Sequence, residues 1–216
     1  MNPFLRTIFP TPILVGASDN REICQKIVAL AYGFKNSAKD ALLVSDQWTR
    51  ATRSSSQEEF EKKGVTSYSS GSLLKNPEWS EVVSFIYALA STMIQSVNNN
   101  PAVRPSLINM WTTIYPPGAF VPEHVHSNAL LSGVFYAKAP ENCGNLLFKD
   151  PAYVAKTMFM RTVGEFPSVA TMHVIDVATG SMVLFPAWLP HQTEANESKE
   201  DRVIVSFNLN MVENRS

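Results

Sequence analysis

Two of the four histidines in this chain stand one residue apart, in the stretch PEHVHSNALLSG. In an extended segment the side chains alternate between two faces, so His124 and His126 are expected to project to the same side. Two neutral imidazoles on one face are suited to bind a first-row metal ion. A third histidine, His191, follows in FPAWLPHQ. The three histidines are therefore candidate metal ligands, and a site with three protein ligands keeps positions open for a substrate or dioxygen.

A second group of candidates lies in the stretch RVIVSFNLN. With a period of two, one face of a strand here carries Arg202, Ile204, Ser206 and Asn208, while the other face is apolar and suited to pack against helices. A guanidinium fork matches a carboxylate through two hydrogen bonds. Arg202 is therefore expected to hold an anion beside the metal, such as a dicarboxylate whose other end binds the metal. An ion pair with a surface acidic residue is the alternative for Arg202.

The elements that must position these residues change character near residue 103. Before it, apolar residues at helical spacing predict two helices. The first has a capping box at Asp19 and Glu22, and the second begins at Asn76 with Pro77 in its first turn. After residue 103, short β-branched and aromatic runs are separated by turn residues such as Gly118 and Gly180. Many short strands without helices between them favour a sandwich or barrel.

The sequence thus predicts an α+β chain with a single domain over residues 1–216. Residues 1–102 would supply helical support and loops, and residues 103–216 a β-barrel core. Residues 46–72, rich in Ser, Lys and Glu, are expected to form a surface loop, and both this segment and residues 151–170 are candidate loops that contact a substrate. His173 has no partner at a suggestive spacing, so a structural role is expected for it.

Composition disfavours several classes of partner and location. The chain has 216 residues, a formal net charge of -1 and two cysteines, Cys24 and Cys143. No basic stripe with interleaved aromatic residues is present, so nucleic acid is not a favoured partner. No stretch reaches the roughly 18 apolar residues of a membrane span, and the two distant cysteines do not predict a disulfide framework. A cytoplasmic protein is expected; the oligomeric state stays open, with a homodimer as one option.

The two stretches resemble known motifs. YPPGAFVPEHVHS is similar to the proximal His-x-Asp segment of the iron(II)- and 2-oxoglutarate-dependent oxygenases, and GSMVLFPAWLPHQTEANESKEDRVIVSFN to their distal His…Arg segment. Over nearly the whole chain, the sequence is most similar to a group of such oxygenases from marine phages and bacteria. That group shares an N-terminal FPTPI and a central H-x-H…SGVFY. The resemblance implies a double-stranded β-helix, or jelly-roll, barrel.

The resemblance also implies cofactors and roles. Iron(II) would be bound with 2-oxoglutarate and dioxygen, and a substrate would be hydroxylated with release of succinate and CO2. His124 and His191 take the roles of iron ligands. Arg202 takes that of the residue holding the distal carboxylate of 2-oxoglutarate, assisted by Tyr115. Ser206 and Asn128 are further candidates for cosubstrate contacts, since Asn128 has the same parity as the two histidines.

One position departs from the family pattern. The usual aspartate of His-x-Asp is here His126, which either ligates the metal or leaves that role to a carboxylate such as Asp150. Two alternatives to the oxygenase therefore stay open. One is a cupin-type metal enzyme that does not use 2-oxoglutarate, although Leu130 and Trp188 stand where the cupin motifs expect glutamate and glycine. The other is a non-catalytic barrel that serves as a structural or binding module. The identity of the primary substrate is not predicted.

Overall fold

Helices and antiparallel strands both contribute to the fold. A computed structural model describes residues 11–37, 42–43, 65–67, 72–98, 100, 102–153, 155 and 171–213. The helical elements are α1 (Arg21–Ser37), α3 (Ser80–Gln95) and two single 3-10 turns, η3 (Leu73–Lys75) and η4 (Pro77–Trp79). No helix among these residues is long and apolar enough to cross a membrane.

The larger of two sheets has seven strands in the order β1-β8-β5-β10-β4-β3-β2, and every neighbouring pair is antiparallel. Its strands are β1 (Leu14–Ala17), β2 (Leu42–Leu43), β3 (Val65–Thr66), β4 (Val103–Tyr115), β5 (Leu131–Lys138), β8 (Ser181–Pro186) and β10 (Arg202–Glu213). The long strand β10 lies between β4 and β5, so its residues have partners on both sides.

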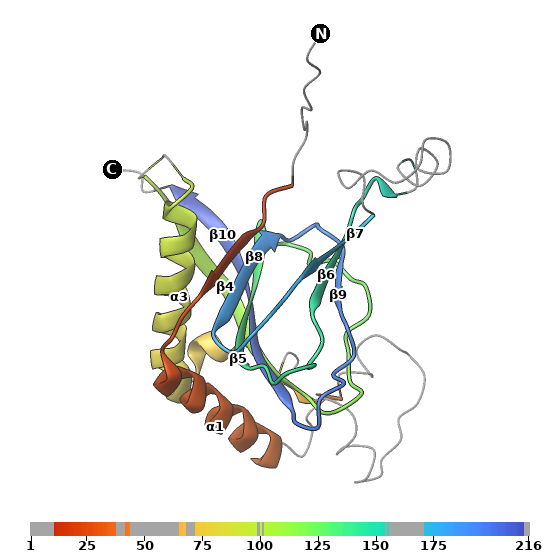
Figure 1. The fold of residues 1–216 in the computed structure, drawn as a ribbon. Coiled ribbons are helices and arrows are strands. Elements are labelled where there is room, and N and C mark those ends of the chain that lie inside the picture. The colour runs from red at the N-terminus through yellow and green to blue at the C-terminus, as the bar shows by residue number, and fades with distance from the viewer. Residues whose placement is uncertain are drawn as a thin grey trace.

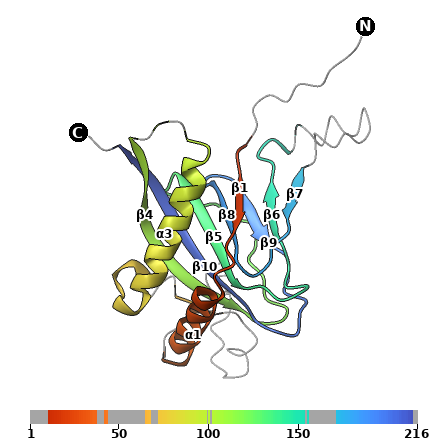
Figure 2. The ribbon, with the colours of Figure 1, turned by 60° about the vertical axis from the view of Figure 1, so that its left-hand side comes forward.

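The smaller sheet has three strands in the order β7-β6-β9. They are β6 (Leu146–Lys149), β7 (Met172–Ile175) and β9 (His191–Thr193). The two helices lie against one face of the larger sheet, and the smaller sheet lies on the opposite side (Figures 1 and 2). The molecule therefore has three layers, and the larger sheet is the middle one.

Each space between layers holds its own core. Between the helices and the larger sheet, Ile27, Val82 and Ile86 pack in one cluster with the apolar face of β10, including Phe207. Between the sheets a second cluster contains Phe148, Phe185 and Ile204, together with two tyrosines. The period-two prediction for β10 is thus confirmed: one face of the strand supports the helices, and the other faces the smaller sheet.

The helix starts follow capping chemistry, with one correction. Asn76 Oδ1 accepts a hydrogen bond from Glu78 N, and Pro77 opens η4, which leads directly into α3. The predicted capping box at Asp19 is wrong, because the side chain of Asn20 accepts the hydrogen bond from Ile23 N. Each cap satisfies one of the amide groups that a first helical turn leaves without an intrahelical partner.

The first half of the chain contains more than helices and loops. Strands β1, β2 and β3 add to the larger sheet from residues before 103, and β1 pairs along β8. The predicted loop 46–72 contributes β3 and the residues near it, while most of that loop and most of residues 151–170 lie outside the described residues. Cys24 and Cys143 are both buried and free, as the sequence predicts.

Strand β4 contains one extra residue opposite β10. Asn109 pairs with Asn208 and Leu107 pairs with Leu209, so Ile108 between them has no partner. A bulge of this kind re-aims the side chain at the extra position. Ile108 is 41% exposed and lines the same cavity as its neighbour Asn109, although alternation in a regular strand would place the two on opposite faces.

Candidate active site

Three histidines from two segments meet between the sheets. A ring nitrogen from each of His124, His126 and His191 lies within 4.8 Å of the others. The backbone sets their positions, because His124 and His191 donate their N–H groups to each other's carbonyl oxygens at 2.9 and 3.0 Å. His126 N is held by Ala187 O at 2.8 Å. Backbone pairing therefore brings together side chains that are far apart in the sequence.

The tautomer of the imidazoles follows from their partners. Nδ1 of His124 lies 2.9 Å from Pro122 O, and Nδ1 of His191 lies 2.9 Å from Leu189 O. A carbonyl oxygen only accepts, so both Nδ1 atoms carry the proton. Nδ1 of His126 lies 2.7 Å from Asn208 Oδ1, which is also an acceptor. The lone pairs are then on the Nε2 atoms, which is the arrangement that a metal ion requires.

Burial favours the same uncharged state. It lowers the pKa of His191 to about 3 and that of His124 to about 4, and it also lowers the pKa of His126. At neutral pH the three rings therefore present lone pairs without having to lose a proton first. Among the described residues no carboxylate belongs to this group, and Asp150 instead accepts a hydrogen bond from Ala152 N.

The strands around β10 place polar side chains beside the histidines in successive rows. Because Asn208 lies opposite both Asn109 on β4 and Ser132 on β5, these three residues form one row. Ser132 Oγ lies 2.7 Å from Asn208 Oδ1 and 2.9 Å from Nδ1 of His126. The next rows along the strands are Trp111–Ser206–Val134, then Thr113–Ile204–Tyr136, then Tyr115–Arg202.

Most residues of these rows line a cavity of about 690 Å³ together with the three histidines, whereas Ser132 and Arg202 are fully buried and do not line it. The buried residues Tyr115, Tyr136 and Leu146 line its inner part, whereas Ile108 and Val125, each at least 41% exposed, mark its mouth. A volume of this size accommodates a cosubstrate together with part of a second small molecule.

Arg202 lies at the inner end of the rows and is fully buried. Its Nη1 donates to Cys143 O at 2.7 Å and to Gly144 O at 3.1 Å, and its Nη2 donates to Thr193 Oγ1 at 3.0 Å. The guanidinium stacks on the ring of Tyr115, 4.5 Å from its centroid. Gly144 has φ +83, and a Cβ there would lie 2.6 Å from the backbone oxygens of the 194–195 segment, so glycine is needed for this turn to reach Arg202.

Two buried polar atoms near this end of the cavity have no hydrogen-bond partner within the described structure: Arg202 Nε and Tyr136 Oη. Burial raises the pKa of Tyr136 and Tyr115, and the positive charge of Arg202 opposes that rise in both. Three of the five donors of Arg202 are used by protein oxygens, so Nε–H and one N–H of Nη2 remain. A buried cation with two unused donors and an unpaired phenol fit the carboxylate of a ligand such as 2-oxoglutarate.

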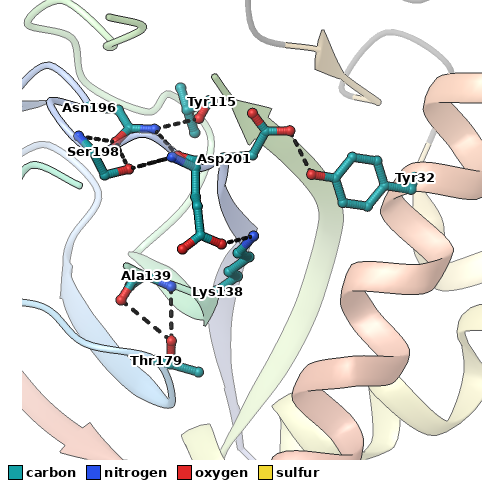
Figure 3. Close-up of polar contacts among 9 residues, drawn as sticks. Tyr32, Tyr115, Lys138, Ala139, Thr179, Asn196, Ser198 and Asp201 are labelled. Atoms are coloured by element: carbon teal, nitrogen blue, oxygen red, sulfur yellow. Dashed lines mark hydrogen bonds and ion pairs between the residues drawn. The ribbon is translucent and has the colours of Figure 1, made fainter. Parts of the chain in front are cut away.

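A network of side chains fixes the loop that leads into Arg202 (Figure 3). The buried amide of Asn196 donates to Tyr115 O at 2.9 Å and to Glu200 O at 2.8 Å, and its oxygen accepts from Ser198. At the end of the loop, Tyr32 of α1 donates to Asp201 at 2.6 Å. The loop between the last histidine and the arginine is thus held to β4 and to α1.

The other residues singled out by the sequence have definite places. Ser206 lies in the second row and lines the cavity, and Thr193 lines it beside Arg202. Asn128 lines the mouth, but it has φ 64 and lies in a turn, so the parity rule for strands does not apply to it. His173 is exposed on β7 and is not part of the histidine group.

Sequence reasoning did not single out Tyr136, Thr193 or Ser132. Ser132 and Tyr136 share one parity in LSGVFYAK, which indicates a common face of a strand. The sequence alone does not show that this face lies beside the histidines and Arg202, because that follows only from the pairing of β5 with β10.

Comparison with known proteins finds a family model that matches the part of the chain containing these residues. Residues 109–208 match the family model described as "Putative 2OG-Fe(II) oxygenase". A search of curated proteins found no match.

Several solved structures have a similar fold. A prolyl-4-hydroxylase from Pseudomonas putida is 13% identical, with 93% of this chain and 94% of that chain covered and a TM-score of 0.57. A prolyl hydroxylase from Trichoplax adhaerens is 11% identical, with 91% and 82% covered and a TM-score of 0.57. The carbocyclase SnoK from nogalamycin biosynthesis is 12% identical, with 92% and 79% covered and a TM-score of 0.59. At such low identity these likenesses show the fold alone.

The three histidines and Arg202 all lie inside the segment that matches the family model. That segment takes up somewhat less than half of the chain, and it includes the first part of β10, from Arg202 to Asn208, which faces the site. The resemblance predicted from the sequence is thereby confirmed: over residues 109–208 the chain matches the 2OG-Fe(II) oxygenases, a family that uses iron(II), 2-oxoglutarate and dioxygen.

Proposed function

We propose that this chain is an iron(II)- and 2-oxoglutarate-dependent oxygenase that hydroxylates a substrate with release of succinate and CO2. The observation that carries the proposal is a histidine cluster in the cavity with a buried arginine behind the same wall. Each of the three imidazoles brings a ring nitrogen within 4.8 Å of the others, and the arginine, which has unused donors, lies farther in along the same rows of strand residues. Hydroxylation is the reaction that the sequence resemblance implies, although one similar structure is a carbocyclase and another an epimerase.

The proposal includes an assignment of the fold as a double-stranded β-helix in a single domain. The two antiparallel sheets that face each other are taken as the halves of a double-stranded β-helix. Residues 103–216 would form that barrel, residues 1–102 would support it, and the two parts would make a single domain. The shared core of the helices and β10 supports a single domain, since neither part could expose that surface alone.

The proposed roles follow the rows of the cavity wall. His124, His126 and His191 hold the metal. Arg202 and Tyr136 hold the distal carboxylate of 2-oxoglutarate, since they have the donors that the protein itself leaves unused. Tyr115 keeps the guanidinium flat against its ring, and Ser206 lies between the two groups in the second row. The exposed Asn128, at the mouth, is placed to meet the primary substrate.

The residues of the chain position the reactants and exclude water. When bound, iron(II), 2-oxoglutarate and dioxygen supply an oxidative decarboxylation that is coupled to oxidation of the substrate. The Nδ1–H contacts of the three histidines hold the rings in one tautomer and one orientation, which avoids reorganisation during turnover. Phe185 and Val134 line the same cavity with apolar surface, and this disfavours water beside the histidines.

The alternative of a cupin-type enzyme that does not use 2-oxoglutarate gives Arg202 only a structural role. That role is real, because Arg202 binds the carbonyl oxygens of the Cys143–Gly144 turn. It does not explain the unused Nε donor or the unpaired Tyr136 hydroxyl, since buried polar groups without partners are costly. Both atoms are explained by a bound carboxylate.

An anaerobic titration tests the proposal. Purified protein is titrated with iron(II) and then with 2-oxoglutarate, while the weak visible charge-transfer band of the chelated complex is followed. The expected result is a band that saturates with one equivalent of each. In Tyr136→Phe the band should need more 2-oxoglutarate, and in His191→Ala it should be absent.

Two outcomes would contradict the proposal in different ways. Iron binding without the band would favour the enzyme that does not use 2-oxoglutarate. Binding of neither would favour a structural or binding module. If the band forms, the release of succinate with a panel of candidate substrates would then show which compound couples to turnover.

A further inference from the structure

The third histidine stands where the family pattern has an aspartate, and its surroundings keep it neutral. Asn208 Oδ1 lies 2.7 Å from Nδ1 of His126 and also accepts from Ser132. An amide and a hydroxyl therefore take the place in which metal-ligating histidines often have a carboxylate. Neither the ligand nor the groups that contact it bring a negative charge to the site.

The other described residues of the cavity do not supply a negative charge either. The described residues that line it include no aspartate, glutamate, lysine or arginine. Arg202, which is buried opposite the lining residue Tyr115, is positive and pairs with no carboxylate in the described part of the chain. Every fixed charge that the described residues bring to this site is thus positive.

The charges of the loaded site do not balance. Iron(II) and Arg202 together bring three positive charges, and 2-oxoglutarate brings two negative ones. With an aspartate at position 126 the sum would be zero, and with histidine it is one positive charge. An unbalanced charge inside a low-dielectric cavity is unfavourable, so an anion bound there gains more than it would in water.

The polar groups of the wall suit an anion. Asn208 uses its amide oxygen for His126 and Ser132, which leaves its N–H donors for a ligand in the cavity that it lines. Ser206 adds a hydroxyl in the next row. Both are neutral donors that can hydrogen-bond to an anion without adding charge.

Building on the proposed function, we propose that the cavity binds one further negative charge beside the three histidines, in addition to 2-oxoglutarate. The ligand is a monoanion that takes over the charge-balancing part of the missing aspartate. It is either a small inorganic anion or an anionic group of the primary substrate itself. The substrate class expected in the second case is an organic acid, whose charged group enters the cavity first.

Azide is a suitable probe, because it is small and monoanionic. The protein is loaded with cobalt(II), whose visible bands respond to ligands, and azide is titrated at constant ionic strength with and without 2-oxoglutarate. In Asn208→Asp a carboxylate of nearly the same shape replaces the amide behind His126. In His126→Asp the family's carboxylate is restored. His173→Asp, on exposed β7, changes the net charge in the same way far from the histidine group and is the matched control.

The expected result is that azide binds the unmodified protein and the His173→Asp control equally, and binds Asn208→Asp at least about tenfold more weakly. His126→Asp should show the same loss if it retains cobalt. Equal azide affinity in the unmodified protein and Asn208→Asp would overturn the inference, and so would absence of azide binding to the cobalt-loaded protein.

The outcome is separable from that of the proposed function. Formation of the iron(II)–2-oxoglutarate band without anion binding would remove only this inference. Anion binding without the band would remove only the oxygenase, and failure to bind any metal would remove both. Competition of azide with organic acids and with their neutral amides then distinguishes the sources. Displacement by an acid but not by its amide identifies a substrate group, and displacement by inorganic anions alone identifies a co-ligand.

Discussion

His124 and His191 exchange both of their backbone hydrogen bonds, although 66 positions separate them in the sequence. This isolated bridge pairs the first residue of β9 with His124, which itself lies outside the named strands. The relative position of the two imidazoles is therefore set by the main chain and does not depend on a bound ion. Loss of one metal-binding side chain should therefore leave the backbone of the site in place.

Replacing His191 with alanine should abolish metal binding while the fold persists. The backbone bridge does not need the side chain, and two imidazoles remain, so we expect the metal affinity to fall by at least about 100-fold. Metal-binding calorimetry measures this change, and circular dichroism reports the fold. His173→Ala is the matched control, since it removes the one histidine outside the group. Stoichiometric iron in His191→Ala would contradict the assignment of the ligand.

Replacing Tyr136 with phenylalanine should separate stability from cosubstrate binding. The hydroxyl is buried without a partner, so its removal should leave the free energy of unfolding of the ligand-free protein unchanged or raise it by about 1 kcal/mol. The affinity for 2-oxoglutarate should fall by about 10-fold or more, because a hydrogen bond to a carboxylate is lost. Chemical denaturation measures the free energy of unfolding, and the charge-transfer titration measures the affinity for 2-oxoglutarate. Tyr87→Phe, at an exposed position on α3, is the control. A loss of stability with unchanged 2-oxoglutarate affinity would show that the hydroxyl serves the fold.

Two substitutions of Arg202 should differ. Arg202→Ala removes the hydrogen bonds to the Cys143–Gly144 turn and leaves buried carbonyl groups unpaired, so we expect a destabilised protein. Arg202→Lys keeps a charge but loses the planar fork, so its main effect should be a 2-oxoglutarate affinity lower by about 10-fold or more, with little change for the metal. Calorimetry with each ligand in turn checks this, and Arg104→Lys on the exposed part of β4 is the control. Equal losses for metal and 2-oxoglutarate would point to general unfolding.

The Asn196 amide should be important for the loop that precedes Arg202. Asn196→Ala removes the side-chain donor to Tyr115 O and one of the two donors to Glu200 O, and we expect the free energy of unfolding to fall by about 2–4 kcal/mol. Ser198→Ala, which removes a more exposed partner in the same loop, should cost less. Denaturant titration of both variants tests the order, and a larger loss for Ser198→Ala would show that the loop is held in another way.

Much of the site could be predicted because its residues lie in regular or strongly patterned segments. The period of two in RVIVSFNLN predicts correctly that Ser206 and Asn208 face the cavity while Phe207 packs against the helices. The spacing of His124 and His126 predicts correctly that the two rings meet. These predictions need only the local geometry of an extended chain.

What was missed depends on pairing between distant strands. Tyr136 lies in an apolar strand, and its hydroxyl gains meaning only because β5 pairs with β10 beside Arg202. The two-residue strands β2 and β3 have no local pattern at all, since so few residues show no periodicity. For Asn128 the parity argument does not hold, because a backbone with φ 64 no longer alternates its side chains.

The bulge in β4 separates two functions within one strand. Ile108 reaches the mouth of the cavity without taking part in the pairing of its neighbours, while Asn109 stays opposite Asn208. A change in the size of this one side chain should alter which molecules can enter the cavity, while the rows of strand residues beside the histidines keep their register. The strand thus contains a place where access to the cavity can be changed, in evolution or in the laboratory, without changing the rows behind it.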